Sequence, residues 1–86
     1  MDIRGQFGRL LRDMRISKGL TQEELAFRAG MNVTYLSDIE RGRSSPSLTL
    51  LADLAMALGT HPADLLREIR LEGESPAGGR KRPKDR

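Results

Sequence analysis

The chain has 86 residues, of which 37% are hydrophobic and only 3% are aromatic. This length suits a single domain, and a core of aliphatic side chains packs better between helices than within a sheet. The absence of cysteine excludes disulfide bonds and cysteine-ligated metal sites. No apolar stretch approaches the roughly 20 residues that cross a membrane, and the N-terminus has no signal-peptide core. We therefore expect a cytoplasmic protein with no membrane partner.

The formal net charge is +3, but the basic residues are unevenly distributed along the chain. Residues 73–86 contain five basic and two acidic side chains, whereas residues 1–72 contain ten of each. Residues 73–86 are also rich in glycine and proline and have no apolar periodicity. We predict a folded domain over residues 1–72, followed by a disordered basic tail. Net charge alone is therefore no argument for nucleic-acid binding by the domain.

Apolar spacing in the domain predicts five helices with short connections, an all-α fold. The expected ranges are about 3–18, 21–29, 32–41 and 47–58, with a fifth helix that begins at residue 60. Polar N-caps and glycine stops define these ends. The expected N-caps are Thr21 (in a capping box with Glu24), Asn32, Ser47 and Thr60. The side chains expected to face inward include Phe7, Leu11, Met14, Leu25, Ala26, Ala29, Leu36, Ile39, Leu48, Leu51, Leu54, Ala55, Leu58, Leu65, Leu66 and Ile69.

Residues 22–41 have the spacing of a helix-turn-helix motif. Such a motif needs a small residue where the two helices cross, and Ala26 supplies it. Its turn needs a residue that tolerates positive φ, and Gly30 follows four positions later. Leu36 and Ile39 would then anchor the second helix against the core. The joint match of these positions is far more specific than any one of them.

Two segments carry a family resemblance. Residues 15–26 (RISKGLTQEELA) and residues 35–42 (YLSDIERG), followed by Ser45–Leu48, resemble the Cro/C1-type (XRE) helix-turn-helix family. The resemblance extends over about residues 7–69. It implies a compact, lambda-repressor-like five-helix bundle, with the helix-turn-helix formed by the second and third helices.

The resemblance also implies roles for individual residues. Arg15 and Glu40 match an internal ion pair that ties the first helix to the third. Residues expected to contact base edges are Asn32, Val33, Thr34, Ser37 and Asp38. Residues expected to contact the DNA backbone are Gln22, Tyr35, Arg41, Arg43 and Ser47. General chemistry agrees, because Thr34 can hydrogen-bond a base edge and arginines suit phosphates. Asp38 can accept a hydrogen bond from cytosine N4, although phosphates repel its charge.

The expected function is that of a sequence-specific transcriptional regulator that binds double-stranded DNA, a repressor or controller protein. One small domain reads few base pairs, so we expect a homodimer on an inverted repeat. The fifth helix, with Leu65, Leu66 and Ile69, is the expected dimer interface.

Two other binding functions remain open at this stage, an antitoxin that also binds a toxin and a protein–protein adaptor. The arginines at Arg41 and Arg43 favour DNA over an adaptor. An enzyme is not expected, because the chain has one histidine, His61, and neither a phosphate-binding glycine loop nor a carboxylate cluster. We also expect no metal, no cofactor and no small-molecule effector.

Overall fold

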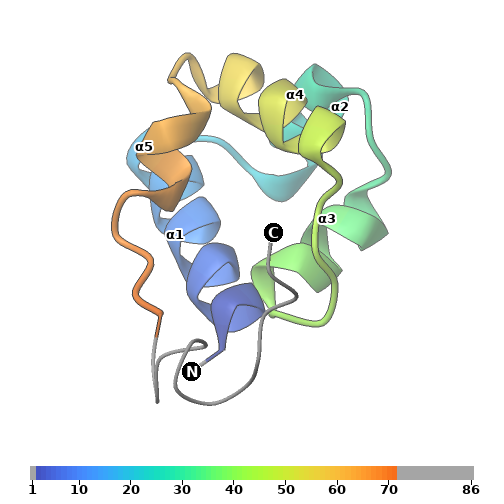
Figure 1. Ribbon diagram of the computed structural model, residues 1–86. Helices are drawn as coiled ribbons and strands as arrows, with labels where there is room; N and C mark the ends of the chain where they lie inside the picture. Colours follow the sequence, from blue (N-terminus) through green and yellow to red (C-terminus); the bar gives the residue numbers. More distant parts are fainter. Residues whose placement is uncertain (1, 72–86) are drawn as a thin grey trace.

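The computed structural model describes residues 2–71, and these residues form five helices without any strand (Figure 1). The helices are α1 (Ile3–Ser17), α2 (Gln22–Ala29), α3 (Val33–Glu40), α4 (Leu48–Leu58) and α5 (Pro62–Leu66). The all-α prediction is therefore confirmed. Residues 73–86, the predicted basic tail, lie outside the described residues.

Three predicted N-caps are present. Thr21 and Glu24 form the reciprocal capping box of α2, with N–O distances of 3.0 and 2.8 Å. The Asn32 side chain accepts hydrogen bonds from the N–H groups of Thr34 and Tyr35, and Ser47 Oγ accepts one from Leu50. These acceptors satisfy backbone donors that a helix N-terminus otherwise leaves without partners.

The predicted cap of the fifth helix is wrong by one residue. His61, not Thr60, is the N-cap of α5, and its Nδ1 accepts a hydrogen bond from the Ala63 N–H. The Thr60 N–H instead donates to Ala55 O and so completes the C-terminal end of α4. The Thr60 hydroxyl donates to Asp64. Pro62 stands in the first turn of α5, as predicted.

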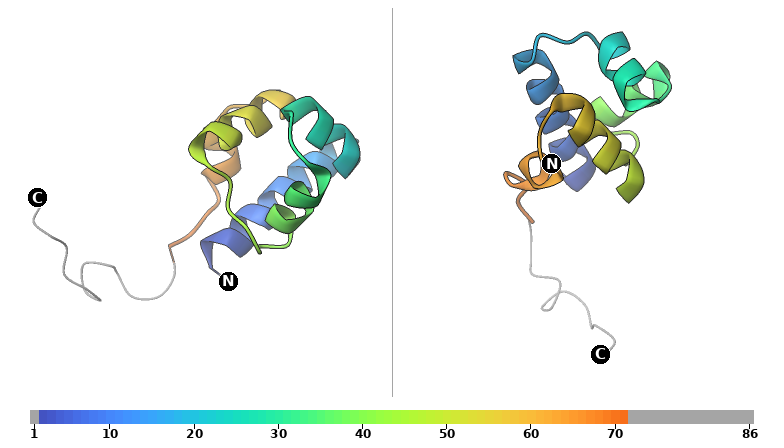
Figure 2. Two further views of the ribbon diagram at one scale, coloured as in Figure 1. Left: turned by 90° about the vertical axis from the view of Figure 1, so that its right-hand side faces the viewer. Right: turned by 90° about the horizontal axis from the view of Figure 1, so that it is seen from above.

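The five helices form a closed ring around one core. The main contacts run from α1 to α3, from α3 to α2, from α2 to α4, from α4 to α5, and from α5 back to α1. Figure 1 and the left view of Figure 2 show this ring. Its centre is filled by the buried hydrophobic side chains Phe7, Leu11, Leu25, Ala26, Ala29, Leu36, Ile39, Leu51, Leu54, Ala55, Leu58 and Leu65.

The structure corrects the predicted core at two positions. Leu48 is 83% exposed, because it lies in the first turn of α4, beyond the neighbours that cover the rest of its apolar stripe. Leu66 is 41% exposed, whereas its neighbour Leu65 is fully buried. Ile69 follows α5 and is only partly buried against the core. None of the helices over residues 2–71 is long and apolar enough to span a membrane.

Candidate nucleic-acid interface

The helix-turn-helix prediction is confirmed in its geometry. Ala26 is 3% exposed, and its small side chain lies inside the crossing of α2 with its neighbours. Gly30 ends α2 with φ +70°, a left-handed conformation that favours glycine. The Met31 N–H then donates to Ala26 O at 2.9 Å, which closes the turn. Leu36 and Ile39 are fully buried, so the opposite face of α3 is turned away from the core.

A buried ion pair fixes the C-terminal half of α3. Arg15 Nε lies 2.7 Å from Glu40 Oε2, and Arg15 Nη2 lies 3.0 Å from Glu40 Oε1. The two side chains are only 11% and 2% exposed. The hydrogen bonds with Glu40 raise the pKa of Arg15 above its usual value. The pair therefore ties α1 to α3, as the family resemblance implied.

Gln22 joins the same network from α2. Its Nε2 donates to Glu40 Oε1 at 3.0 Å, and Arg15 Nη1 donates to Leu20 O at 2.9 Å. Three helices thus meet at one carboxylate. Because an Arg–carboxylate fork is directional, this network restricts both the position and the rotation of α3.

The backbones of α1 and α3 are in close contact, and this contact fixes the distance between the two helices. The sequence analysis did not predict it. A Cβ atom on Gly8 would lie 2.4 Å from Ile39 O and 2.6 Å from Glu40 O. A Cβ atom on Gly42 would lie 3.0 Å from the Cα of Gly5. The sequence does contain a signal for it, the two glycines inside α1. Glycine destabilises a helix, so its presence there usually has a packing reason.

The outer face of α3 carries most of the predicted base-contacting residues. Asn32 uses Oδ1 to accept from the N–H groups of Thr34 (2.7 Å) and Tyr35 (3.2 Å). Thr34 is exposed, and its hydroxyl has no hydrogen-bond partner within residues 2–71. Asp38 is half-buried, and its carboxylate likewise makes no hydrogen bond or ion pair in this part of the chain. Both side chains are free to bind an external partner.

The other two predicted base contacts are engaged within the fold. Val33 is half-buried and packs partly against the core. Ser37 Oγ accepts a hydrogen bond from Arg41 Nη2 at 2.7 Å. That bond holds the Arg41 guanidinium along the surface of α3, one turn after Ser37.

The predicted backbone-contacting residues continue from α3 into the loop before α4. The Arg43 N–H donates to Asp38 O at 2.9 Å, and the exposed Arg43 guanidinium makes no ion pair within the described chain. The Tyr35 hydroxyl donates to Ser45 O at 2.9 Å. Ser47 caps α4, and it begins that helix on an exposed stretch of chain, where the helix N-terminus favours an anion.

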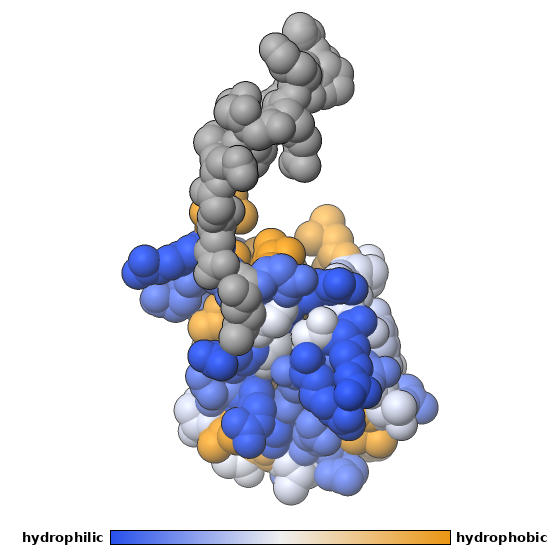
Figure 3. Space-filling view, turned by 90° about the horizontal axis from the view of Figure 1, so that it is seen from below, coloured by the Kyte–Doolittle hydropathy of each residue, from blue (hydrophilic) through white to orange (hydrophobic). Residues whose placement is uncertain are grey.

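These residues therefore form one continuous surface, from the first turn of α3 to the start of α4. The end of the molecule that carries the first turn of α1 and the α3–α4 loop is largely hydrophilic, with smaller hydrophobic patches (Figures 1 and 3). Within residues 2–71, no cluster of three histidine or acidic side chains is placed to hold a metal ion.

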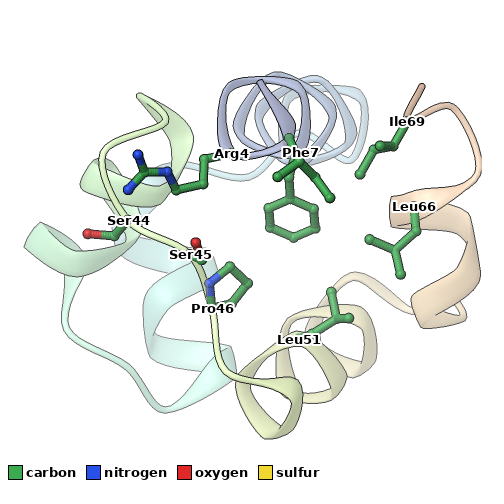
Figure 4. Close-up of a pocket in the computed structure, with 9 residues that line it drawn as sticks. Arg4, Phe7, Ser44, Ser45, Pro46, Leu51, Leu66 and Ile69 are labelled. Atoms are coloured by element: carbon green, nitrogen blue, oxygen red, sulfur yellow. The ribbon is translucent and has the colours of Figure 1, made fainter. Parts of the chain in front are cut away.

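A separate apolar pocket of about 190 Å³ lies between α1, α4, α5 and the α3–α4 loop. Phe7, Leu51, Leu66 and Ile69 point into it, with Pro46 on the loop side (Figure 4). Leu66 at its rim is 41% exposed. This surface has few polar groups and is chemically distinct from the outer face of α3.

Comparison with known proteins places this chain in one family. Residues 11–65 match the helix-turn-helix family HTH_3. An uncharacterized HTH-type transcriptional regulator of Sinorhizobium fredii is 41% identical over 80 residues, which cover 93% of this chain and all of that protein. Control protein C.BamHI of Bacillus amyloliquefaciens is 46% identical over 66 residues, or 76% of this chain and 82% of that protein.

A longer relative and two solved structures agree. HTH-type transcriptional regulator DdrOP3 of Deinococcus deserti is 43% identical over 68 residues, and this chain spans about half (53%) of its length. The restriction-modification controller protein C.AhdI of Aeromonas hydrophila has a TM-score of 0.71 at 42% identity, over 72% of this chain and 94% of that one. The clp gene regulator ClgR of Corynebacterium glutamicum has a TM-score of 0.76 at 43% identity, over 79% and 72%.

Proposed function

Because this chain belongs to the helix-turn-helix family of DNA-binding transcriptional regulators, we propose that it reads duplex DNA with the outer face of α3 in the major groove. One observation carries the proposal. Thr34 and Asp38 have no partner within the described chain, although the helix that presents them is fixed by buried contacts. A rigid helix with free polar groups on its outer face is what base recognition requires.

The base contacts follow from the chemistry of each group. The Thr34 hydroxyl can donate to or accept from a base edge, and the Asp38 carboxylate can accept from cytosine N4. Asn32 keeps its amide N–H groups for DNA, since its Oδ1 caps α3. Val33 and the Ser37 hydroxyl border this set and complete the proposed base-reading surface.

The phosphate contacts flank that surface on both sides. On the loop side, one DNA strand would be held by Arg41, Arg43 and the α4 N-terminus at Ser47. Gln22 would contact the other DNA strand, beside α2. Because a phosphate contact releases counterions, binding should weaken steeply with salt. These contacts fix register and orientation but carry no base preference.

We further propose that two copies bind one inverted repeat. The residues of the predicted interface have different surroundings in the structure. Leu65 belongs to the core, whereas Leu66 borders the apolar pocket. A second copy seated over that pocket would cover Leu66 and Ile3, which is 54% exposed. Removing such apolar area from water favours association, at about 25 cal/mol per Å² before the costs of binding.

The proposed activity is binding without catalysis, in the cytoplasm where the DNA is accessible, and without a metal or small-molecule effector. A selection from random DNA duplexes at physiological salt tests it. We expect enrichment of an inverted repeat with half-sites about one helical turn apart. Failure to enrich any sequence, with weak binding that added salt abolishes, would refute sequence-specific recognition and would favour an antitoxin or adaptor function.

A further inference from the structure

The segment between α3 and α4 is held by several hydrogen bonds at its two ends, whereas its middle makes far fewer. At its start, the N–H groups of Gly42 and Arg43 donate to Ile39 O (3.0 Å) and Asp38 O (2.9 Å). At its end, Ser47 caps α4. Residues 44–46 lie between these fixed points, and Pro46 has no N–H to donate.

A single hydrogen bond holds the middle of this segment. The Tyr35 hydroxyl donates to Ser45 O at 2.9 Å, and residues 44–46 make no other hydrogen bond with the described part of the chain. The backbone N–H groups of Ser44 and Ser45 therefore have no internal acceptor. They are additional donors for a phosphate, next to the Arg43 guanidinium.

Tyr35 also belongs to the base-reading end of α3. It follows Thr34 directly, and its own N–H is held by Asn32 Oδ1. Its ring is stiff, so the hydroxyl links the first turn of α3 to the α3–α4 loop across a nearly fixed distance. The side chain is 36% exposed, and it is not one of the side chains that fill the core.

We propose that Tyr35 is a positioning residue, whose hydroxyl holds residues 44–46 at the spacing from α3 that lets phosphate and base contacts form together. This inference rests on the proposed DNA-binding function. A loop that is already ordered loses less conformational entropy when DNA binds. The hydroxyl acts through the Ser45 carbonyl, so it should affect affinity without affecting which base is preferred.

Tyr35→Phe tests this role, because it keeps the ring and removes only the hydroxyl. On the duplex that the wild-type protein selects, we expect a fivefold to tenfold loss of affinity, roughly the contribution of one hydrogen bond. The slope of log affinity against log salt should become shallower. The ranking of base-substituted duplexes and the thermal midpoint should stay as in the wild-type protein.

A double-mutant cycle separates positioning from direct contact with DNA. If the hydroxyl positions the loop, Tyr35→Phe should cost at least twofold less in an Arg43→Ala background than in a Thr34→Ala background. Equal losses in both backgrounds would mean that the hydroxyl contacts DNA itself, and would overturn the proposal. Wild-type affinity in Tyr35→Phe would overturn it as well. A wild-type protein that selects no duplex would refute the proposed function, and this inference with it.

Discussion

Replacing Glu40 with alanine should strongly destabilise the domain, because it leaves the buried Arg15 guanidinium without its counter-charge. Within residues 2–71, Arg15 makes two hydrogen bonds to the Glu40 carboxylate and otherwise only one, to Leu20 O. Gln22 Nε2 loses its partner in the same substitution. Breaking a buried ion pair on one side typically costs about 3–5 kcal/mol.

That loss is large against the stability of a domain of this size. About 70 described residues at 0.05–0.15 kcal/mol each give a free energy of unfolding of roughly 4–10 kcal/mol. A loss of about 3 kcal/mol should lower the thermal midpoint by at least about 12 °C. Circular dichroism melts at neutral pH measure this directly.

Two further variants make the test specific to the pair. Asp13→Ala also removes one carboxylate, but Asp13 is exposed and makes no ion pair in the described chain, so its melt should match wild type within a few degrees. Arg15→Met with Glu40→Met removes both charges and should melt well above Glu40→Ala. A Glu40→Ala melt within about 5 °C of wild type would refute the reasoning.

Three other predictions concern the packing of α3 against α1, the pH dependence of stability and the formation of a dimer. Gly8→Ala should lower the thermal midpoint despite a higher helix propensity, because its Cβ would lie 2.4 Å from Ile39 O; an unchanged melt would contradict the close contact. Hydrogen bonds from Thr60, Arg67 and the His61 N–H hold the pKa of Asp64 well below its usual range. The stabilisation by the Asp64 carboxylate should therefore be complete above about pH 4 and should fade as the pH falls further. In acid melts, Asp64→Asn should make the free energy of unfolding depend less on pH below about pH 4. A pH dependence identical to that of the wild-type protein would contradict this effect. Leu66→Glu should leave the fold intact and yield a monomer in light scattering, and a variant that still dimerises would exclude this pocket as the interface.

Local signals in the sequence predicted the helix boundaries well. The caps at Thr21, Asn32 and Ser47 depend on short-range hydrogen bonds, which the residue types themselves encode. The predicted ends of the first and third helices differ from the structure by one residue each, since Lys18 and Arg41 are C-caps. The ion pair between Arg15 and Glu40 came from the family resemblance rather than from spacing.

Contacts between elements were harder to predict. Periodicity places Leu48 on the apolar face of α4, but it cannot show that no other helix covers the first turn of that face. The start of α5 was predicted one residue too early, because Thr is the more usual N-cap than His. In the structure, the Thr60 N–H donates to Ala55 O at the end of α4. The bond from Tyr35 to Ser45 joins residues ten positions apart through a loop, and no pattern in the sequence marks it.

The central claim is that the outer face of α3 reads base edges, and a specificity profile tests it most directly. The affinity of the wild-type protein, Thr34→Ala, Asp38→Ala and Arg43→Ala would be measured on every single-base variant of the selected duplex. We predict that Thr34→Ala and Asp38→Ala each lose about 1–3 kcal/mol of discrimination at one position per half-site. Arg43→Ala should weaken binding to all duplexes equally. Wild-type discrimination at every position in both α3 variants would contradict the claim.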